Sequence, residues 1–222
     1  VEVLLAERLG PARWRALVRP AARIKPGEEL ELEHGVFVAH IDSGLDLAHP
    51  QLAGRFFTNA ASPISDVGPT ASDSGHGTFI GGVIAGLDST TPTPTNGSIA
   101  GATYRGIASG ARLYPLSLYA TDYTNYGNTW LITNAALATN IFIVNNSWGY
   151  PVSTYDINSA LFDEAVRDSL PFRTNNQPMT HVFAAGNGGG ANSGGLGGAA
   201  DTIASPGNGK NVITVGASEL FR

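Results

Sequence analysis

The sequence predicts an α/β domain with a mostly parallel central sheet flanked by helices. Four short, nearly continuous apolar runs are each followed by Gly, Asp or Asn, and they cover residues 36–41, 141–144, 181–185 and 212–215. Such runs are typical of strands that are buried on both faces, as in parallel sheets. Helical patterns lie between them, and strands that alternate with helices favour right-handed crossover connections.

Apolar residues recur at helical spacing in residues 78–87, in residues 130–139 and, most clearly, in residues 156–170. Asp156 is suited to cap the start of the third segment, because its carboxylate can accept hydrogen bonds from the first free amides of a helix. The tract from Ser89 to Asn96, rich in Thr and Pro, is predicted to be a surface loop.

The composition excludes several classes of protein. Hydrophobic residues make up 42% of the 222 positions, which is enough for a packed core. The formal net charge of −5 argues against a nucleic-acid-binding surface. Without cysteine there is neither a disulfide framework nor a thiolate metal site. No apolar run approaches the roughly 18 residues of a membrane span, and a charged fraction of only 14% is compatible with an exported protein.

Residues 1–33 differ from the rest of the chain, because Arg and Glu are concentrated there. Leu4 and Leu9 fit one helical stripe, and a second stripe follows a break at Gly10. We therefore predict an N-terminal extension over residues 1–33 and a separate α/β domain over residues 34–222.

Polar residues follow three of the predicted strands and are expected to gather at one edge of the sheet. Asp42 follows the first strand, Asn146 and Ser147 end the second, and Asn187 comes after the third. The carboxyl ends of parallel strands meet at one edge, where open α/β sheets place their functional groups. His76 lies in a loop that opens a helix. A carboxylate, an imidazole and a carboxamide together suit acyl transfer, in which Asp fixes the histidine tautomer, His moves protons and Asn stabilises an oxyanion.

Six segments, in the same chain order, resemble those of the subtilisin-like serine peptidases, or subtilases. They are Val38–Asp46 for the aspartate segment, Gly75–Gly86 for the histidine segment, Gly106–Ala111 for the turn and strand that follow, Asn146–Gly149 for the substrate-binding strand, Ala184–Asn187 for the oxyanion segment and Ser205–Ala217 beyond it. The resemblance implies a three-layer subtilisin-like fold, incomplete at its C-terminal side. It also implies a serine endopeptidase with an Asp-His-Ser triad.

The resemblance implies three catalytic residues in this chain. Asp42 would orient His76, and His76 would act first as general base and then as general acid toward the leaving amine. The Asn187 side chain would donate a hydrogen bond to the tetrahedral oxyanion. In subtilisin, loss of the corresponding donor lowers the turnover number about 10²–10³-fold.

The resemblance further implies that an extended peptide or protein substrate binds between two segments. Ser147, Trp148 and Gly149 would pair with the substrate backbone as an added strand, and Ala184, Ala185 and Gly186 would form a wall of the pocket for the residue before the cleaved bond. Residues 119–127, which include three tyrosines, are expected on the opposite side of the peptide.

The family also implies a biological context. The protein is expected to be secreted or extracytoplasmic and to need no cofactor for its chemistry, and the family is compatible with structural calcium. From the composition, neither a nucleic-acid partner nor a membrane span is expected in this chain. Residues 1–33 would be the tail of an inhibitory prodomain, a linker or a docked helix pair. By resemblance, the Ser205–Pro206 peptide bond is expected to be cis.

The sequence departs from the family pattern in three places. The Gly-Thr-Ser-Met-Ala segment that carries the nucleophile in the family is absent. We therefore expect the serine to lie beyond residue 222 and this chain alone to be inactive. Phe79 stands where relatives usually have a second histidine, a change that a helix tolerates. Gln51 stands where many relatives have Asp, which removes a carboxylate from the corresponding calcium site.

Two alternative functions remain open. Residues 186–191 match a Gly-x-Gly-x-x-Ala dinucleotide fingerprint. That fingerprint requires a helix, however, and the density of glycine through residue 198 disfavours one. A non-catalytic peptide-binding module could also keep the subtilase scaffold without its nucleophile. His40, His49 and His181 are interpreted as strand or turn residues rather than metal ligands.

Overall fold

The computed structural model describes residues 2–10, 13–19, 36–57, 75–87, 105–138, 141–189 and 199–217. The chain forms two units, Val1–His34 and Gly35–Arg222. All the predicted site residues belong to the second unit.

The first unit contains a β-hairpin where helices were predicted. Strand β1 (Glu2–Gly10) pairs antiparallel with strand β2 (Arg13–Arg19). The register shifts between Leu5 and Glu7 and again before Gly10. Such irregularities disrupt the period of two by which a strand is recognised in a sequence, so the helical interpretation was wrong. The predicted break at Gly10 is confirmed, because β1 ends there.

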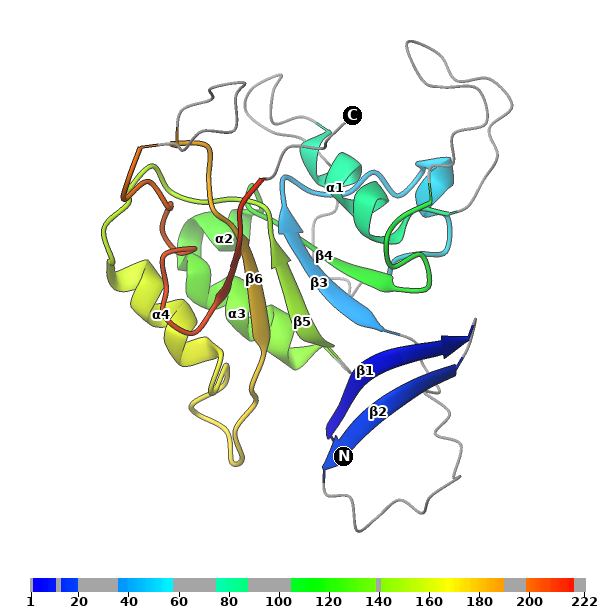
Figure 1. The fold of residues 1–222 in the computed structure, drawn as a ribbon. Helices are drawn as coiled ribbons and strands as arrows, with labels where there is room; N and C mark the ends of the chain where they lie inside the picture. Colours follow the sequence, from blue (N-terminus) through cyan, green and yellow to red (C-terminus); the bar gives the residue numbers. More distant parts are fainter. Residues whose placement is uncertain are drawn as a thin grey trace. The chain divides into compact units, whose positions relative to one another are not determined.

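The second unit is built on a parallel sheet, as predicted (Figure 1), and this sheet has five strands. Its strands are β3 (Phe37–Asp42), β4 (Arg112–Ser117), β5 (Ile141–Asn146), β6 (Thr180–Ala184) and β7 (Ile213–Val215). They lie in the order β4-β3-β5-β6-β7, and all four neighbouring pairs are parallel. β4 was not among the four apolar runs, because Pro115 interrupts its pattern; a proline is tolerated there since β4 lies at the sheet edge.

The described residues contain four α-helices and a short 3₁₀ turn. These are η2 (Pro50–Leu52), α1 (His76–Ala85), α2 (Thr121–Tyr126), α3 (Asn128–Leu137) and α4 (Ile157–Ala165). Three α-helices were predicted; α1 and α3 each begin two residues earlier than expected, and α4 ends earlier. Helix α2 was not predicted, because six residues are too few to show an apolar period.

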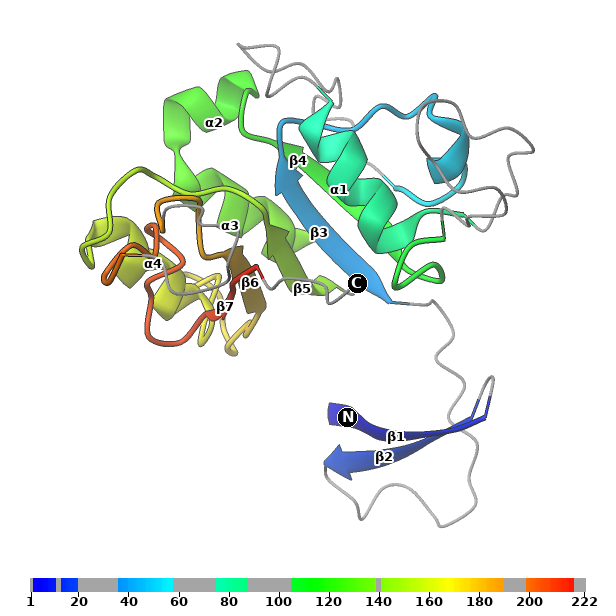
Figure 2. The ribbon, with the colours of Figure 1, turned by 45° about the horizontal axis from the view of Figure 1, so that its top comes forward.

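Helices pack on both faces of the sheet, which gives the predicted three-layer architecture (Figure 2). Alternate residues of β3 belong to different hydrophobic clusters. Val38 packs with Ala85 of α1, whereas Ala39 packs with Leu131 of α3. Successive strand residues point to opposite faces, so α1 and α3 lie on opposite sides of the sheet. Helix α4 joins the α3 side, where its Phe162 packs on β6.

Asp156 caps α4, as predicted, and also ties this helix to a distant loop. Its Oδ1 accepts hydrogen bonds from the backbone amides of Asn158 and Ser159, both at 3.0 Å, and from the Ser205 hydroxyl at 2.6 Å. Burial acts to raise the pKa of Asp156, but the hydrogen bonds from Ser205, Ser159 and Asn158 outweigh it and lower the pKa to about 2. The Ser205–Pro206 peptide bond is cis, as the resemblance implied.

Candidate active site

Asp42 lies at the carboxyl end of β3, where its carboxylate is buried and held by neighbours. Oδ1 accepts hydrogen bonds from the Ser43 backbone amide at 2.7 Å and from the Ser43 hydroxyl at 3.3 Å. Ser43 is held in turn by Ser117, whose hydroxyl donates to the Ser43 carbonyl at 2.8 Å. These bonds fix the orientation of the carboxylate at the edge of the sheet.

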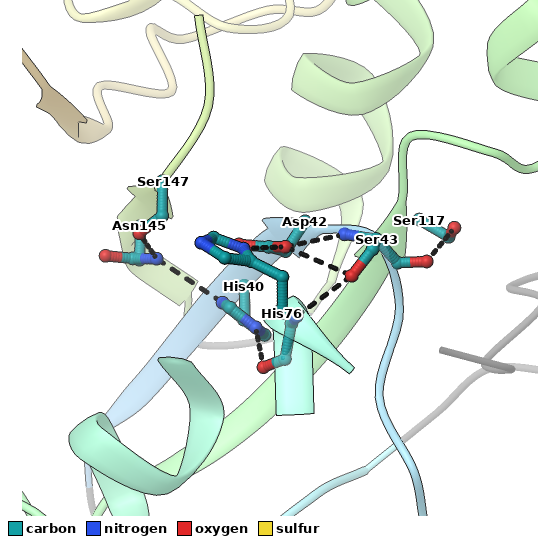
Figure 3. A network of polar contacts seen from close by, with 8 residues as sticks. His40, Asp42, Ser43, His76, Ser117, Asn145 and Ser147 are labelled. Carbon is teal, nitrogen blue, oxygen red and sulfur yellow. Dashed lines mark hydrogen bonds and ion pairs between the residues drawn. The ribbon is translucent and has the colours of Figure 1, made fainter. Parts of the chain in front are cut away.

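His76 is the first residue of α1, and its Nδ1 lies 2.7 Å from Oδ1 of Asp42 (Figure 3). The His76 side chain is 41% exposed and that of Asp42 only 4%, so the pair meets solvent on its imidazole side. A carboxylate can only accept a hydrogen bond, which places the proton on Nδ1 and leaves Nε2 able to take one up. In the part of the chain that the structure describes, no hydrogen bond engages Nε2.

Two glycines let α1 begin beside Asp42. A Cβ on Gly77 would lie 2.1 Å from the carbonyl oxygen of Gly44, so only glycine fits. The Gly77 amide also donates to the Ser43 hydroxyl at 2.9 Å. Gly77 is therefore required by a close approach of two backbones. Gly75 has open space around it and is instead required by its left-handed backbone, with φ of 85°.

Asn187, the predicted oxyanion residue, follows β6 and is exposed. Only β5 separates β6 from β3, and the three strands are parallel. The topology therefore brings Asn187 to the edge that holds Asp42, and its role as an oxyanion donor stays a prediction.

The predicted pocket wall, Ala184–Gly186, is anchored on both sides. The Ala185 amide donates to the Val215 carbonyl, and the Ala185 carbonyl accepts from the Ala204 amide, both at 2.9 Å. Gly186 adopts φ of 91°, and a Cβ there would lie 2.8 Å from the Cβ of Ala204. The wall is therefore a fixed turn with small side chains.

The predicted substrate-binding segment continues directly from β5. The Trp148 ring packs edge-on against Phe183 at 5.5 Å and against Phe162 at 5.9 Å between ring centroids. Its side chain therefore belongs to the core. Substrate pairing along Ser147, Trp148 and Gly149 would rest on their backbone groups, as the added-strand prediction requires.

The tyrosines of residues 119–127 divide into two kinds. The Tyr123 hydroxyl lies 2.9 Å from the Tyr150 hydroxyl, and burial together with this hydrogen bond raises the pKa of Tyr123 well above its usual value. Tyr119 and Tyr126 are exposed by 42% and 69%. Tyr123 therefore has a structural role, and the position of Tyr119 and Tyr126 beside a bound peptide stays a prediction.

Sequence reasoning missed two residues beside the hydrogen-bonded Asp42–His76 pair, His40 and Asn145. His40 lies in β3, as interpreted, but its ring reaches both the first turn of α1 and the Asn145 side chain (Figure 3). The sequence did contain a signal for His40. It lies two residues after Val38, and residues two apart in a strand share a face of the sheet.

Within the described ranges, no group of three or more His, Asp or Glu side chains is arranged to hold a metal ion. Structural calcium therefore remains a prediction. Residues 186–189 form no helix, which disfavours the dinucleotide alternative, and the rest of that motif lies outside the described residues. None of the helices that the structure describes is long and apolar enough to cross a membrane.

A cavity of about 510 Å³ opens between α3, α4 and the segment that follows α4. Its lining includes Ile132, Leu161, Asp168 and Phe172. Since α3 and α4 cover the face of the sheet opposite α1, this cavity is separate from the Asp42–His76 pair.

The chain is similar in sequence to known serine proteases. The profile of the subtilase family matches residues 33–220. The Aeromonas extracellular serine protease of Aeromonas sobria is 32% identical over 168 residues, which are 71% of this chain and 24% of that protein. Subtilisin E of Bacillus subtilis (strain 168) is 31% identical over 185 residues, which are 82% of this chain and 40% of that protein.

The fold has a match among solved structures. A cold-adapted subtilisin-like serine proteinase aligns with a TM-score of 0.51 over 84% of this chain and 56% of that one, at 22% identity. At this identity the likeness shows a shared fold. The chain spans less than half the length of the two sequence relatives above.

Proposed function

Because this chain belongs to the subtilase family, we propose that it forms part of a serine endopeptidase with an Asp-His-Ser triad. The observation that carries the proposal is the 2.7 Å hydrogen bond between His76 Nδ1 and Asp42 Oδ1 at the carboxyl end of a parallel sheet. Asp42 and His76 supply two members of the triad. The serine would come from a segment beyond residue 222.

In the proposed reaction, His76 Nε2 removes the proton of the serine hydroxyl while the serine oxygen bonds to the carbonyl carbon of the substrate. Asp42 keeps Nδ1 protonated and stabilises the imidazolium that forms. The carbonyl oxygen takes up negative charge, and the Asn187 side chain donates a hydrogen bond to it. His76 then gives its proton to the leaving amine as the C–N bond breaks, and water releases the acyl group by the same steps.

The proposed substrate is an extended stretch of peptide. It would pair with the backbone of Ser147–Gly149 on one side and face residues 119–127 on the other, and the Ala184–Gly186 wall would line the pocket for the residue before the cleaved bond. The packing of Trp148 in the core and the two hydrogen bonds of Ala185 support this proposal, because they make both segments rigid before a peptide arrives.

Exposed apolar side chains on the sheet support the proposal that a further segment of the protein supplies the serine. Ile143, Ile213 and Val215 are exposed by 39%, 51% and 55%, on the face of the sheet opposite α3 and α4. Parallel sheets are normally covered on both faces. We place the serine-bearing segment on this surface, next to the helix that begins with His76.

The whole protein is also proposed to act outside the cytoplasm, in keeping with the relative named as an extracellular serine protease. Residues 1–33 are proposed as an N-terminal extension, either a prodomain tail or a linker.

The proposal can be tested on a longer protein that contains residues 1–222 and continues past Arg222. We expect it to react with a fluorophosphonate probe and to hydrolyse a peptide, whereas residues 1–222 alone do neither. His76→Ala should abolish labelling, and His49→Ala, at a half-buried turn, should preserve it. Undiminished labelling of His76→Ala would refute the triad. Peptide binding without labelling would favour the non-catalytic module.

A further inference from the structure

His40 occupies a position in β3 that packing alone would fill with an apolar residue. Its side chain is 1% exposed, and it shares the α1 face of the strand with Val38. In the parallel register it lies opposite Asn145 of β5. A buried imidazole loses its hydration, so this position is stable only when the ring nitrogens find partners inside the protein.

Both ring nitrogens of His40 have such partners. Nε2 lies 2.8 Å from the Gly77 carbonyl oxygen, and Nδ1 lies 3.3 Å from Nδ2 of Asn145. A carbonyl can only accept, so Nε2 carries the proton; Nδ1 then accepts from the Asn145 amide. The ring is thus neutral, with one tautomer selected by its two neighbours.

The two hydrogen bonds join the catalytic histidine to the predicted substrate strand. Gly77 directly follows His76 in the first turn of α1, and Asn145 also donates to the Ser147 hydroxyl at 3.1 Å. A continuous path therefore runs from Gly77 through His40 and Asn145 to Ser147 (Figure 3).

We propose that His40 is a positioning residue: it holds the first turn of α1, and with it the His76 imidazole, in register with the substrate-binding segment that starts at Ser147. The assignment rests on the proposed function for the roles of His76 and Ser147. His40 itself touches neither substrate nor reacting atoms. It acts through the Gly77 carbonyl and the Asn145 amide, and both bonds are needed because each fixes one end of the path.

The readout is the Nδ1 proton of His76, which is hydrogen-bonded to Asp42 and is observable by NMR in the ¹⁵N-histidine-labelled chain of residues 1–222. The signal is assigned by its loss in His76→Ala. We expect its solvent exchange to be at least about fivefold faster in His40→Val, because a hydrogen bond of this kind contributes about 1 kcal/mol. His40→Gln, whose amide can donate to Gly77 from a similar position, should restore the slow exchange.

Ser169→Ala is the matched control. It removes another buried side-chain hydrogen bond, from Oγ to the Ala165 carbonyl at 2.7 Å, at the far end of α4. The exchange rate should stay at the parent value in this variant. If His40→Val does not fold, as judged by its ¹H–¹⁵N spectrum, Asn145→Ala replaces it, with the same fivefold acceleration expected because it breaks the path on the other side of the ring.

A parent-like exchange rate in the folded His40→Val variant, or in Asn145→Ala where that variant is used, would overturn the assignment. Equal acceleration in Ser169→Ala would also overturn it, since the effect would then reflect general stability. If the parent chain itself shows no such proton, the Asp42–His76 pair is wrong, and the proposed function fails together with this assignment. An unchanged rate in the His40 variants leaves the proposed function intact.

Discussion

The carbonyl oxygen of Gly44 lies 2.1 Å from the place that a Cβ of Gly77 would occupy. The turn after β3 and the first turn of α1 therefore touch through their backbones, with no room for a methyl group. This contact determines how closely His76, the residue before Gly77, can approach Asp42.

We expect Gly77→Ala to lower the free energy of unfolding by about 2–3 kcal/mol, because overpacking forces the two backbones apart. Gly82→Ala is the matched control in the same helix, where a Cβ has nothing within 4 Å. It should leave the stability unchanged or raise it by up to about 1 kcal/mol, since alanine favours a helix. Urea denaturation measures both changes. Equal effects of the two substitutions would contradict the contact.

His181 makes the stability of the fold depend on pH. It is fully buried in β6 beside Phe162, at 5.0 Å between ring centroids, and its two ring nitrogens find no hydrogen-bond partner among the described residues. Burial lowers the pKa of His181 to about 3. The unfolded chain takes up this proton below its ordinary pKa of 6.5, whereas the folded chain does not. Protonation of His181 therefore takes nothing from the free energy of unfolding above pH 6.5, and it lowers that free energy increasingly as the pH falls toward 3.

We expect the free energy of unfolding to fall by up to about 1.4 kcal/mol for each pH unit below 6, with His181 as a main cause. His181→Leu and His181→Gln should both flatten this dependence, because neither side chain titrates. The leucine variant should be the more stable at neutral pH, since it buries no unpaired polar atom. Denaturant titrations between pH 7 and pH 4 test this, and an unchanged slope in both variants would rule His181 out as the source.

Asp156 should affect the pH dependence of stability in a lower pH range than His181 does. Its pKa is lowered to about 2, so its carboxylate stabilises the fold above its ordinary pKa of 3.8 and this contribution disappears as the pH falls to 2. We expect Asp156→Ala to cost about 2 kcal/mol at neutral pH, and Asp156→Asn less, because asparagine also caps helices.

Asp122 provides the control for Asp156. It lies in the first turn of α2, and no side-chain hydrogen bond is found for it within the described residues. Asp122→Ala should change the free energy of unfolding by less than about 0.5 kcal/mol. A loss as large as that of Asp156→Ala would show that the cap and the link to Ser205 contribute little.

The predictable part of the fold is the part encoded locally. Continuous apolar runs marked four of the five sheet strands, and Asp156 marked the start of α4. The Asp42–His76 hydrogen bond was predictable because parallel strands end at one edge and because the family resemblance named both residues. His40 and Asn145 could not be paired in this way. They lie 105 residues apart, and the register that brings them together shifts between Phe37 and Val38, which no local pattern reveals.

Gly186 offers a test of the predicted oxyanion segment that does not remove Asn187 itself. Alanine at this position would have to adopt φ of 91° and place its Cβ 2.8 Å from the Cβ of Ala204. We expect Gly186→Ala to cost about 2 kcal/mol in stability. In the longer protein it should lower kcat for peptide hydrolysis more than it raises KM, because the displaced neighbour, Asn187, would act only on the oxyanion of the transition state.

Gly188→Ala is the matched control on the other side of Asn187. Its backbone is not left-handed, and the nearest atom to its Cβ would be the Thr202 carbonyl oxygen at an ordinary 3.4 Å. Both kcat and stability should stay close to the parent values. Asn187→Ala, whose backbone turn is preserved, should reproduce the kcat loss of Gly186→Ala without its loss of stability. If Asn187→Ala keeps full activity while Gly186→Ala loses it, the turn matters to the pocket wall, and the oxyanion role of Asn187 is wrong.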